Sequence, residues 1–237
     1  MIKLNFDVKR HTLENGLEVI TIKKDTQIAS INIGVKVGAL YENMKEKGIS
    51  HFIEHTLFKG TINRTGEELN DELEALGGEY NAYTDYDVTV YTISCLIEEF
   101  KKATELLADM IVNPTFDKNE IEKERGVILS EIRMSKDDIE DFSFKNVNKL
   151  AFNKSALKYE VTGLEENVSG FTRKKLMSFY KRYYTPKNSL ITMVSPLEHD
   201  EAINLVKNYF SQWEGQKPEP INIIIEKNKE ITGISYK

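Results

Sequence analysis

The stretch GISHFIEHTLFKG, residues 48–60, holds two of the four histidines of the chain, with a glutamate directly before the second. Read as a helix, it puts its apolar residues on one stripe and His51, Glu54 and His55 within an arc of about 100° on the opposite face. Histidines four positions apart lie one turn apart, so both imidazoles can reach one ion at about 2.0–2.1 Å. Glu54 flanks the pair, where its carboxylate could act on a water beside the metal. The stretch is therefore a candidate catalytic helix with a metal site.

The same pattern also fits an ordinary helix surface. A polar face opposite an apolar stripe is what any solvated amphipathic helix presents. Two histidines are an incomplete site, because catalytic zinc usually has three protein ligands and keeps one position for water. The motif alone leaves both interpretations open, and the choice depends on a third ligand elsewhere in the chain.

Candidates for that ligand stand in NEIEKERGVILSEIRMSKDD, residues 119–138. Read as a helix, this segment places Glu124 and Glu131 inside an arc of apolar residues: Ile121, Val127, Ile128, Leu129 and Ile132. Burying a carboxylate without a partner is costly, so either both lie at the edge of that face and reach water or a cation holds them. They are two turns apart, about 10 Å along the axis, and one ion cannot bind both directly. We expect one to be a ligand and the other a supporting or substrate-side group.

The elements that position these residues can be predicted from the pattern of the chain. RHTLENGLEVITIKK, residues 10–24, predicts a hairpin with its turn at Asn15-Gly16. Thr65 and Glu68 have the spacing of a capping box at the start of a helix. Further strands are expected in ASINIGVKVGAL, EYNAYT, DVTVYTISCL and SLITMVS, and helices over 46–58, 65–76, 98–112, 117–137, 139–152, 172–184 and 199–213. Strands and helices do not alternate regularly, which predicts an α+β domain with a mainly antiparallel sheet and helices packed on it.

Composition excludes several classes of protein. The 237 residues suffice to bury a core, and 40% hydrophobic and 30% charged residues are ordinary for a soluble globular protein. A net charge of −6, spread along the chain, gives no basic footprint for nucleic acid. Cys95 is the only cysteine, so a thiolate zinc site within one chain is excluded. Without a long apolar run or an apolar leader, we expect a soluble, cytoplasmic protein with no membrane partner.

The wider sequence around these motifs resembles the pitrilysin family of zinc metallopeptidases, which includes insulin-degrading enzyme and the mitochondrial processing peptidase. H-x-x-E-H is the inverzincin motif. In this chain GISHFIEHTLFKGT is followed by ELEALGGEYNAYTDYDVTVY and by ERGVILSEI. The resemblance runs from the first hairpin to at least FYKRYYTPKNSL and so covers most of the chain. It implies a fold like that of the mitochondrial processing peptidase.

The resemblance also implies the roles of the site residues. His51, His55 and Glu131 would be the ligands of a Zn²⁺ ion, and Glu54 would be the general base. Glu124 would be a second acidic residue that supports catalysis near the site. The helical pattern independently puts both glutamates on the inward face. Together these observations predict hydrolysis of peptide bonds by a water that zinc and Glu54 activate.

The segment EYNAYT resembles the strand on which family members bind extended peptides. Such binding adds the peptide as a strand, with backbone hydrogen bonds for affinity and pockets for alternate side chains. Asn81, Ala82 and Thr84 would then be substrate-binding residues. The simpler alternative is an edge strand that follows the Gly77-Gly78 turn and has no role in binding.

The length of the chain suggests an incomplete assembly. Family members commonly contain two homologous halves with the active site between them, and this chain is about one half long. We expect a zinc-binding metallopeptidase domain over residues 1–214, and a linker with the start of a second half over 215–237. The expected function is a zinc endopeptidase for short or unstructured peptides that needs a second half for full activity, in the same polypeptide, as a separate subunit or as a homodimer. The alternatives are a non-catalytic scaffold or partner subunit of a processing-peptidase-like assembly and a domain with a structural metal site.

Overall fold

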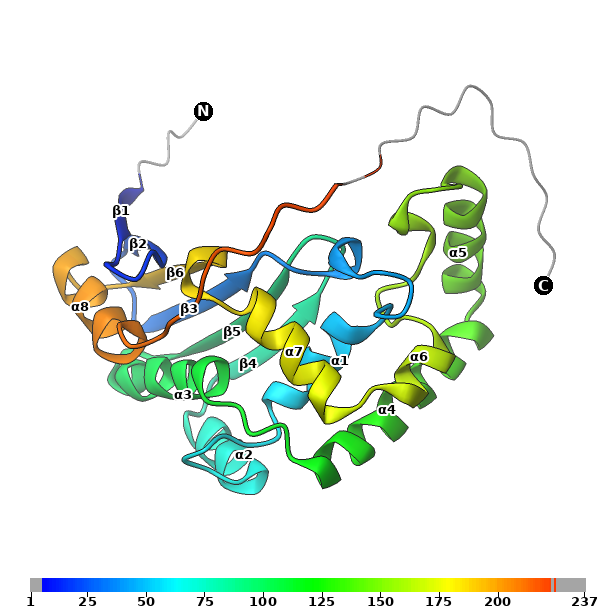
Figure 1. Cartoon of the computed structure of the whole chain (residues 1–237). Helices are drawn as coiled ribbons and strands as arrows, with labels where there is room; N and C mark the ends of the chain where they lie inside the picture. Colours follow the sequence, from blue (N-terminus) through cyan, green and yellow to red (C-terminus); the bar gives the residue numbers. More distant parts are fainter. Residues whose placement is uncertain (1–5, 223, 225–237) are drawn as a thin grey trace.

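Six strands form one sheet in the order β1-β2-β6-β3-β5-β4 in the computed structural model, which describes residues 6–222 and 224 (Figure 1). Every neighbouring pair is antiparallel except β2 and β6, which run parallel. The predicted α+β class with a mainly antiparallel sheet is confirmed. The strands are β1 (Asp7–Thr12), β2 (Glu18–Lys23), β3 (Ile28–Val35), β4 (Glu79–Thr84), β5 (Thr89–Leu96) and β6 (Ser189–Ser195).

The helices lie close to where the sequence predicts them. Their ends differ from the predicted ends by a few residues, and the short helix α6 was not predicted. The helices are α1 (Ile49–Leu57), α2 (Gly66–Ala75), α3 (Phe100–Val112), α4 (Lys118–Asp137), α5 (Ile139–Ala151), α6 (Glu165–Gly170), α7 (Arg173–Tyr183) and α8 (His199–Phe210). Four short 3₁₀ helices cover Ala39–Tyr41, Ile97–Glu99, Ala156–Lys158 and Pro186–Asn188.

The two faces of the sheet differ in polarity. Residues such as Ile31, Ile33 and Ile93 alternate along their strands and are almost fully buried on the face that the helices cover. Figure 1 shows α3, α7 and α8 on this near side of the sheet. The opposite face carries polar residues, of which Asn32 and Thr92 hydrogen-bond to one another across β3 and β5. Such one-sided packing is typical of antiparallel sheets.

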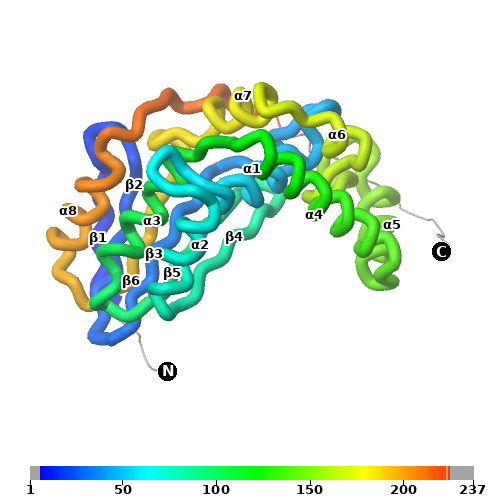
Figure 2. The backbone as a smooth tube through the Cα atoms, turned by 90° about the horizontal axis from the view of Figure 1, so that it is seen from below, coloured from blue at the N-terminus to red at the C-terminus, as the bar shows by residue number. Residues whose placement is uncertain are grey.

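Helix α1 is fixed to the core by one side. Its apolar residues Ile49, Phe52, Ile53 and Leu57 have no exposed surface. The helix also contacts α4 and β4, and Figure 2 shows α4 beside it. The helical periodicity that the sequence shows thus decides which side of α1 is available for chemistry.

A buried carboxylate holds the start of α1. Glu42 accepts hydrogen bonds from the backbone N–H groups of Gly48, at 2.9 Å, and of Ser50, at 2.8 Å. These are donors that the first turn of a helix leaves free, and they favour an anion. Burial raises the pKa of Glu42 to about 7 even though both hydrogen bonds oppose that rise. Gly48 has a φ of 97°, and a Cβ there would lie 2.7 Å from the carbonyl oxygen of Thr162, so the helix start requires glycine.

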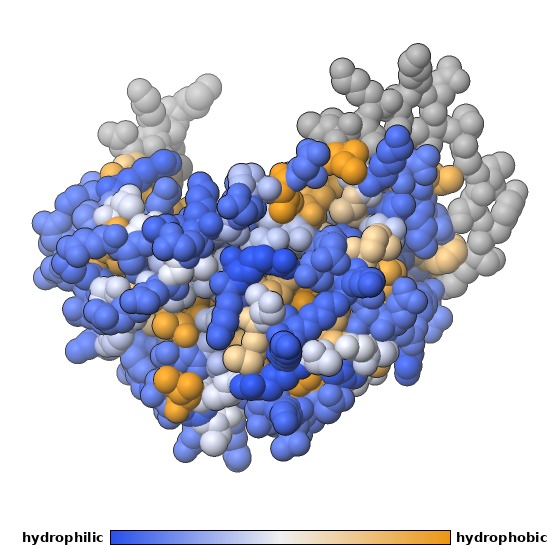
Figure 3. Space-filling model, viewed as in Figure 1, coloured by the Kyte–Doolittle hydropathy of each residue, from blue (hydrophilic) through white to orange (hydrophobic). Residues whose placement is uncertain are grey.

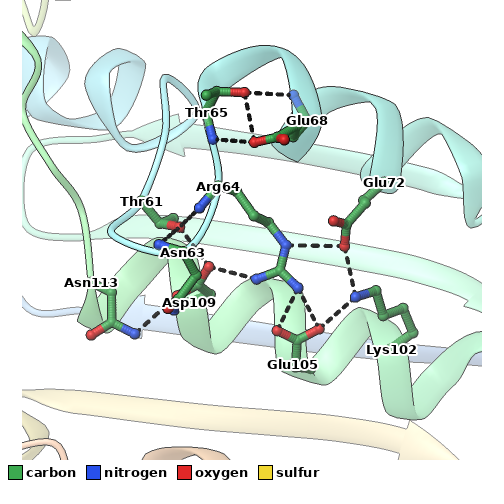
Figure 4. Close-up of polar contacts among 10 residues, drawn as sticks. All are labelled: Thr61, Asn63, Arg64, Thr65, Glu68, Glu72, Lys102, Glu105, Asp109 and Asn113. Atoms are coloured by element: carbon green, nitrogen blue, oxygen red, sulfur yellow. Dashed lines mark hydrogen bonds and ion pairs between the residues drawn. The ribbon is translucent and has the colours of Figure 1, made fainter.

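The loop that follows α1 is tied to α3 by an ionic cluster (Figure 4). Arg64 donates to the carboxylates of Asp109, at 2.7 Å, and of Glu72, at 3.0 Å, and it also pairs with Glu105 at 2.8 Å. The capping box predicted at the next helix is present, with Thr65 and Glu68 each accepting from the other's backbone N–H. The loop between α1 and α2 is thereby tied to both α2 and α3.

Replacing Asp109 by Asn is expected to lower the free energy of unfolding at pH 7 by about 2 kcal/mol or more. Asp109 is 4% exposed. Burial works to raise its pKa, but hydrogen bonds from Thr61, Asn113, Asn63 and Arg64 outweigh burial, so the pKa lies below 3.8. A carboxyl group with a lowered pKa in the folded state stabilises the fold at pH values above its pKa in the unfolded chain. This stabilisation is lost as the pH falls through the pKa of the folded state. The difference from the unsubstituted chain should therefore shrink below about pH 4.

Urea unfolding at a series of pH values measures this difference. The matched control is Asp200→Asn, because Asp200 pairs with Lys9 while its side chain is 82% exposed. An exposed pair of this kind contributes little to the free energy of unfolding, because solvent screens the two charges. Equal losses in the two variants would contradict the role given to Asp109.

The surface of the described residues is mainly hydrophilic on the face that Figure 3 shows. Helix α5 is an exception among the helices, since it buries no residue fully and exposes Ile139, Phe144, Val147 and Leu150. Within the described ranges, no helix combines the length and the apolar character that crossing a membrane requires.

Candidate metal centre

Three candidate ligands converge between α1 and α4. The rings of His51 and His55 lie on the same side of α1, with their centroids 4.6 Å apart. Oε2 of Glu131, on α4, lies 3.8 Å from Nε2 of His51 and 3.7 Å from Nε2 of His55. The three residues offer ligand atoms that all lie within 4.8 Å of one another. The predicted grouping of these side chains is present in the structure.

This donor set fits a zinc ion. Two imidazoles and one carboxylate form a known catalytic zinc set, which leaves one position open. Bond lengths of about 2.0–2.2 Å in a tetrahedral site put the ligand atoms about 3.4 Å apart. The observed separations of 3.7 and 3.8 Å exceed this by a few tenths of an ångström. All three ligand atoms lie within 4.8 Å of one another, so the side chains would have to move closer together to bind the ion.

The electrostatics of the two imidazoles differ. Burial, together with the proximity of His55, lowers the pKa of His51 to about 4. His51 is thus neutral at pH 7, the form in which an imidazole binds a metal. Burial also works to lower the pKa of His55, but its hydrogen bond to Glu124 and the charges of Glu131, Glu54 and Glu124 outweigh burial, and the pKa rises. The site therefore carries a surplus of negative charge that favours a cation.

Glu124 contacts the ring nitrogen of His55 that points away from the candidate metal position. Its Oε2 lies 3.0 Å from Nδ1 of His55, and its Oε1 lies 3.0 Å from Nζ of Lys59. A carboxylate on the far nitrogen of a ligand imidazole fixes the tautomer and leaves Nε2 free for the metal. Burial raises the pKa of Glu124, but the hydrogen bonds from His55 and Lys59 bring it below the usual value. Glu124 therefore contacts the candidate ligand His55 and is not one of the three converging residues.

Glu54 lies in the same space but has different neighbours. Its side chain is nearly buried, and the hydroxyl of Thr84 donates to its Oε2 at 2.6 Å. Burial raises the pKa of Glu54, whereas this hydrogen bond and the charge of His55 oppose the rise. A carboxylate whose pKa is raised is a stronger base and is better suited to accepting a proton.

A cavity of about 290 Å³ opens beside the cluster. Asn81 and Ala82 of β4 line it together with Tyr80, Phe58, Asn70, Glu54, His55, Lys59 and Glu124. Strand β4 is an edge strand that pairs only with β5 among the described strands, which confirms the edge position expected for EYNAYT. Thr84 does not line the cavity, since its hydroxyl is turned to Glu54.

Comparison with known proteins agrees with this geometry. The profile of the insulinase family, peptidase family M16, matches residues 18–164, and the profile of the peptidase M16 inactive domain matches residues 170–235. The chain belongs to peptidase family M16. The predicted resemblance is thus confirmed.

The chain spans about half the length of the curated relatives that it matches. An uncharacterized zinc protease of Rickettsia felis is 36% identical over 211 residues, which are 89% of this chain and 51% of that protein. The β subunit of the bovine mitochondrial-processing peptidase is 34% identical, over 89% of this chain and 43% of that subunit. The crystal structure of a protease from Helicobacter pylori superimposes with a TM-score of 0.86 at 26% identity, over 92% of this chain and 53% of that one.

Some contacts in and around the candidate site have no clear signal in the sequence. Lys59 pairs with Glu124. It is one of many lysines, and its spacing of four residues from His55 is the one sequence feature that associates it with the site. Glu42 precedes the helix, and its partners are the backbone N–H groups of Gly48 and Ser50, which leave no pattern in the sequence. Nδ1 of His51 is buried and has no hydrogen-bond partner among the described residues.

Replacing Glu124 by Gln is expected to weaken zinc binding by about 10–100-fold, because His55 loses the anion that orients its ring. Titration against a chromophoric zinc chelator measures the affinity. The control is Glu122→Gln on the same helix, where the carboxylate is 69% exposed and pairs with Arg125. Unchanged affinity in Glu124→Gln would show that the hydrogen bond to His55 does not contribute to the site.

Proposed function

We propose that this chain is a zinc-dependent endopeptidase domain that hydrolyses short or unstructured peptides. The observation that carries the proposal is the convergence of His51, His55 and Glu131 next to a carboxylate, Glu54, that is no part of that ligand set. A structural site is generally closed and has no use for such a group. A scaffold protein likewise has no chemical need for these four side chains.

The first chemical requirement is an activated water. A zinc ion held by His51, His55 and Glu131 would polarise the scissile carbonyl and lower the pKa of a neighbouring water toward about 7. Glu54 accepts the proton that this water loses as its oxygen bonds to the carbonyl carbon. The C–N bond then breaks, and Glu54 returns the proton to the leaving nitrogen, so that the carboxylate is ready for the next substrate.

The second requirement is an extended peptide held beside Glu54. The free edge of β4 can hydrogen-bond to a peptide backbone as an added strand. Asn81 and Ala82 on that strand line the cavity next to His55 and Glu54. A side chain adjacent to the scissile bond would occupy this cavity. Because most backbone groups of a folded protein are already hydrogen-bonded, the proposed substrates are short or unfolded peptides, whose backbone is free to pair with β4.

The third requirement is a second, homologous half that shields the site from solvent. The chain spans about half the length of the relatives that it matches. Glu131 is 40% exposed, so the site is open to solvent on the α4 side. We propose that a homologous half, in the same polypeptide, in another subunit or in a second copy, completes the active site and raises the activity.

The proposal is tested by incubating the zinc-loaded chain with fluorescently labelled reduced casein and with a folded protein of similar size. We expect slow cleavage of the unfolded substrate only, abolished by a chelator and restored by zinc. Absence of cleavage by a chain that carries zinc would contradict peptidase activity of this chain alone.

A further inference from the structure

The side chain of Thr84 contacts the carboxylate of Glu54. Tyr80, Ala82 and Thr84 alternate along β4 with more exposed residues, so all three turn toward α1. The hydroxyl of Thr84 donates to Oε2 of Glu54 at 2.6 Å. Hydrogen bonds to a charged acceptor are shorter and stronger than those between neutral groups. This contact is therefore suited to fixing the orientation of the carboxylate.

The backbone holds Thr84 in place. It is the last residue of β4 and lies opposite Thr89 of β5. The turn that follows is closed by the N–H of Asp85, which donates to the carbonyl oxygen of Val88 at 2.8 Å. The carbonyl oxygen of Asp85 in turn accepts from the N–H of Ala39 at 3.2 Å. Thr84 is thus anchored to the sheet and to the segment that leads into α1.

The proton of the Thr84 hydroxyl has no comparable competitor. The hydroxyl oxygen of Thr89 lies 3.4 Å from that of Thr84, much farther than Oε2 of Glu54 at 2.6 Å. No hydrogen bond from another described residue reaches Oε1 of Glu54. The two oxygens of this carboxylate are therefore unequal, because Oε2 is held by Thr84 and Oε1 remains available.

We infer that Thr84 is the positioning residue of Glu54, which holds Oε2 so that Oε1 is the atom that exchanges the proton. The inference rests on the proposed function, in which Glu54 is the general base. The water proton passes to Oε1 and then to the leaving nitrogen, while the hydroxyl of Thr84 keeps its own proton. A hydroxyl can donate to Oε2 whether Glu54 is ionised or protonated on Oε1. Thr84 thus supports both stages of the reaction, and it is assigned to the base and not to peptide binding.

Two substitutions separate the hydroxyl from the shape of the side chain. Thr84→Val removes the donor and keeps the volume, and Thr84→Ser keeps the donor. With zinc-loaded protein and labelled reduced casein, Thr84→Val should lower kcat by about 10–100-fold with KM and zinc content unchanged. Thr84→Ser should retain kcat to within about threefold. The control is Thr92→Val, because the Thr92 hydroxyl bonds Asn32 on the opposite face of the sheet. A Thr84→Val enzyme with the kcat of the unsubstituted chain, or an equal loss in Thr84→Ser, would overturn the inference.

Crystal structures of the zinc-loaded variants give a readout that does not require activity. The Glu54 carboxylate should leave its position or occupy several conformations in Thr84→Val, and it should keep the original position in Thr84→Ser. An unchanged Glu54 in Thr84→Val overturns the inference even if no hydrolysis is measurable. Conversely, a displaced Glu54 in a chain that cleaves nothing supports the positioning role and contradicts only the proposed peptidase activity.

Discussion

Replacing Glu54 by Gln is expected to lower the rate of peptide hydrolysis by about 10²–10⁴-fold. Gln has the same size and can still accept the hydrogen bond from Thr84 through its amide oxygen, but it cannot take a proton from water. Glu54 is not among the three residues that could hold a metal, so zinc content should stay the same. The initial rate of casein cleavage and the zinc content of the same sample measure the two effects.

The control for Glu54→Gln is Glu122→Gln, an exposed position on α4 that pairs with Arg125. Cleavage at the unsubstituted rate in Glu54→Gln would remove Glu54 as the base. Loss of zinc together with activity would instead indicate that Glu54 holds the metal. The paired measurement therefore distinguishes a catalytic residue from a ligand.

Replacing Glu131 by Gln is expected to weaken zinc binding by more than about 100-fold, beyond the range typical of a residue that only supports a ligand. Glu131 contributes the only negative charge among the three converging residues, and its Oε2 lies 3.7 and 3.8 Å from the two imidazoles. The two histidines would remain as an incomplete pair. Competition with a chromophoric chelator measures the dissociation constant. An affinity equal to that of Glu122→Gln would rule out Glu131 as a ligand.

The part of the fold that depends on local pattern could be predicted from the sequence. The turn at Asn15-Gly16 joins β1 and β2 as expected, and the capping box of Thr65 and Glu68 starts α2. Both signals depend on residues within a few positions of one another. The position of β6 in the sheet could not be predicted in this way, because its partners β2 and β3 lie far from it in the sequence. Helix α6 is too short for periodicity to reveal it.

The helical periodicity of α4 located the two glutamates of the site but not their contacts. Glu124 is buried and Glu131 is partly exposed, and Val127, placed in the predicted apolar arc, is 45% exposed because it lies at the edge of the packed face. The hydrogen bond from Thr84 to Glu54 joins residues 30 positions apart. Thr84 and Glu54 meet because β4 packs against α1. A motif within one segment therefore could not predict this hydrogen bond.

The most direct test of the metal centre is anomalous diffraction at the zinc edge from crystals of the zinc-loaded chain. We predict one strong peak within about 2.0–2.2 Å of Nε2 of His51, Nε2 of His55 and a carboxylate oxygen of Glu131. Glu54 should lie near that peak without bonding to it. A chain that shows no peak between α1 and α4, or that binds zinc only at other residues, would contradict the site on which the proposed function depends.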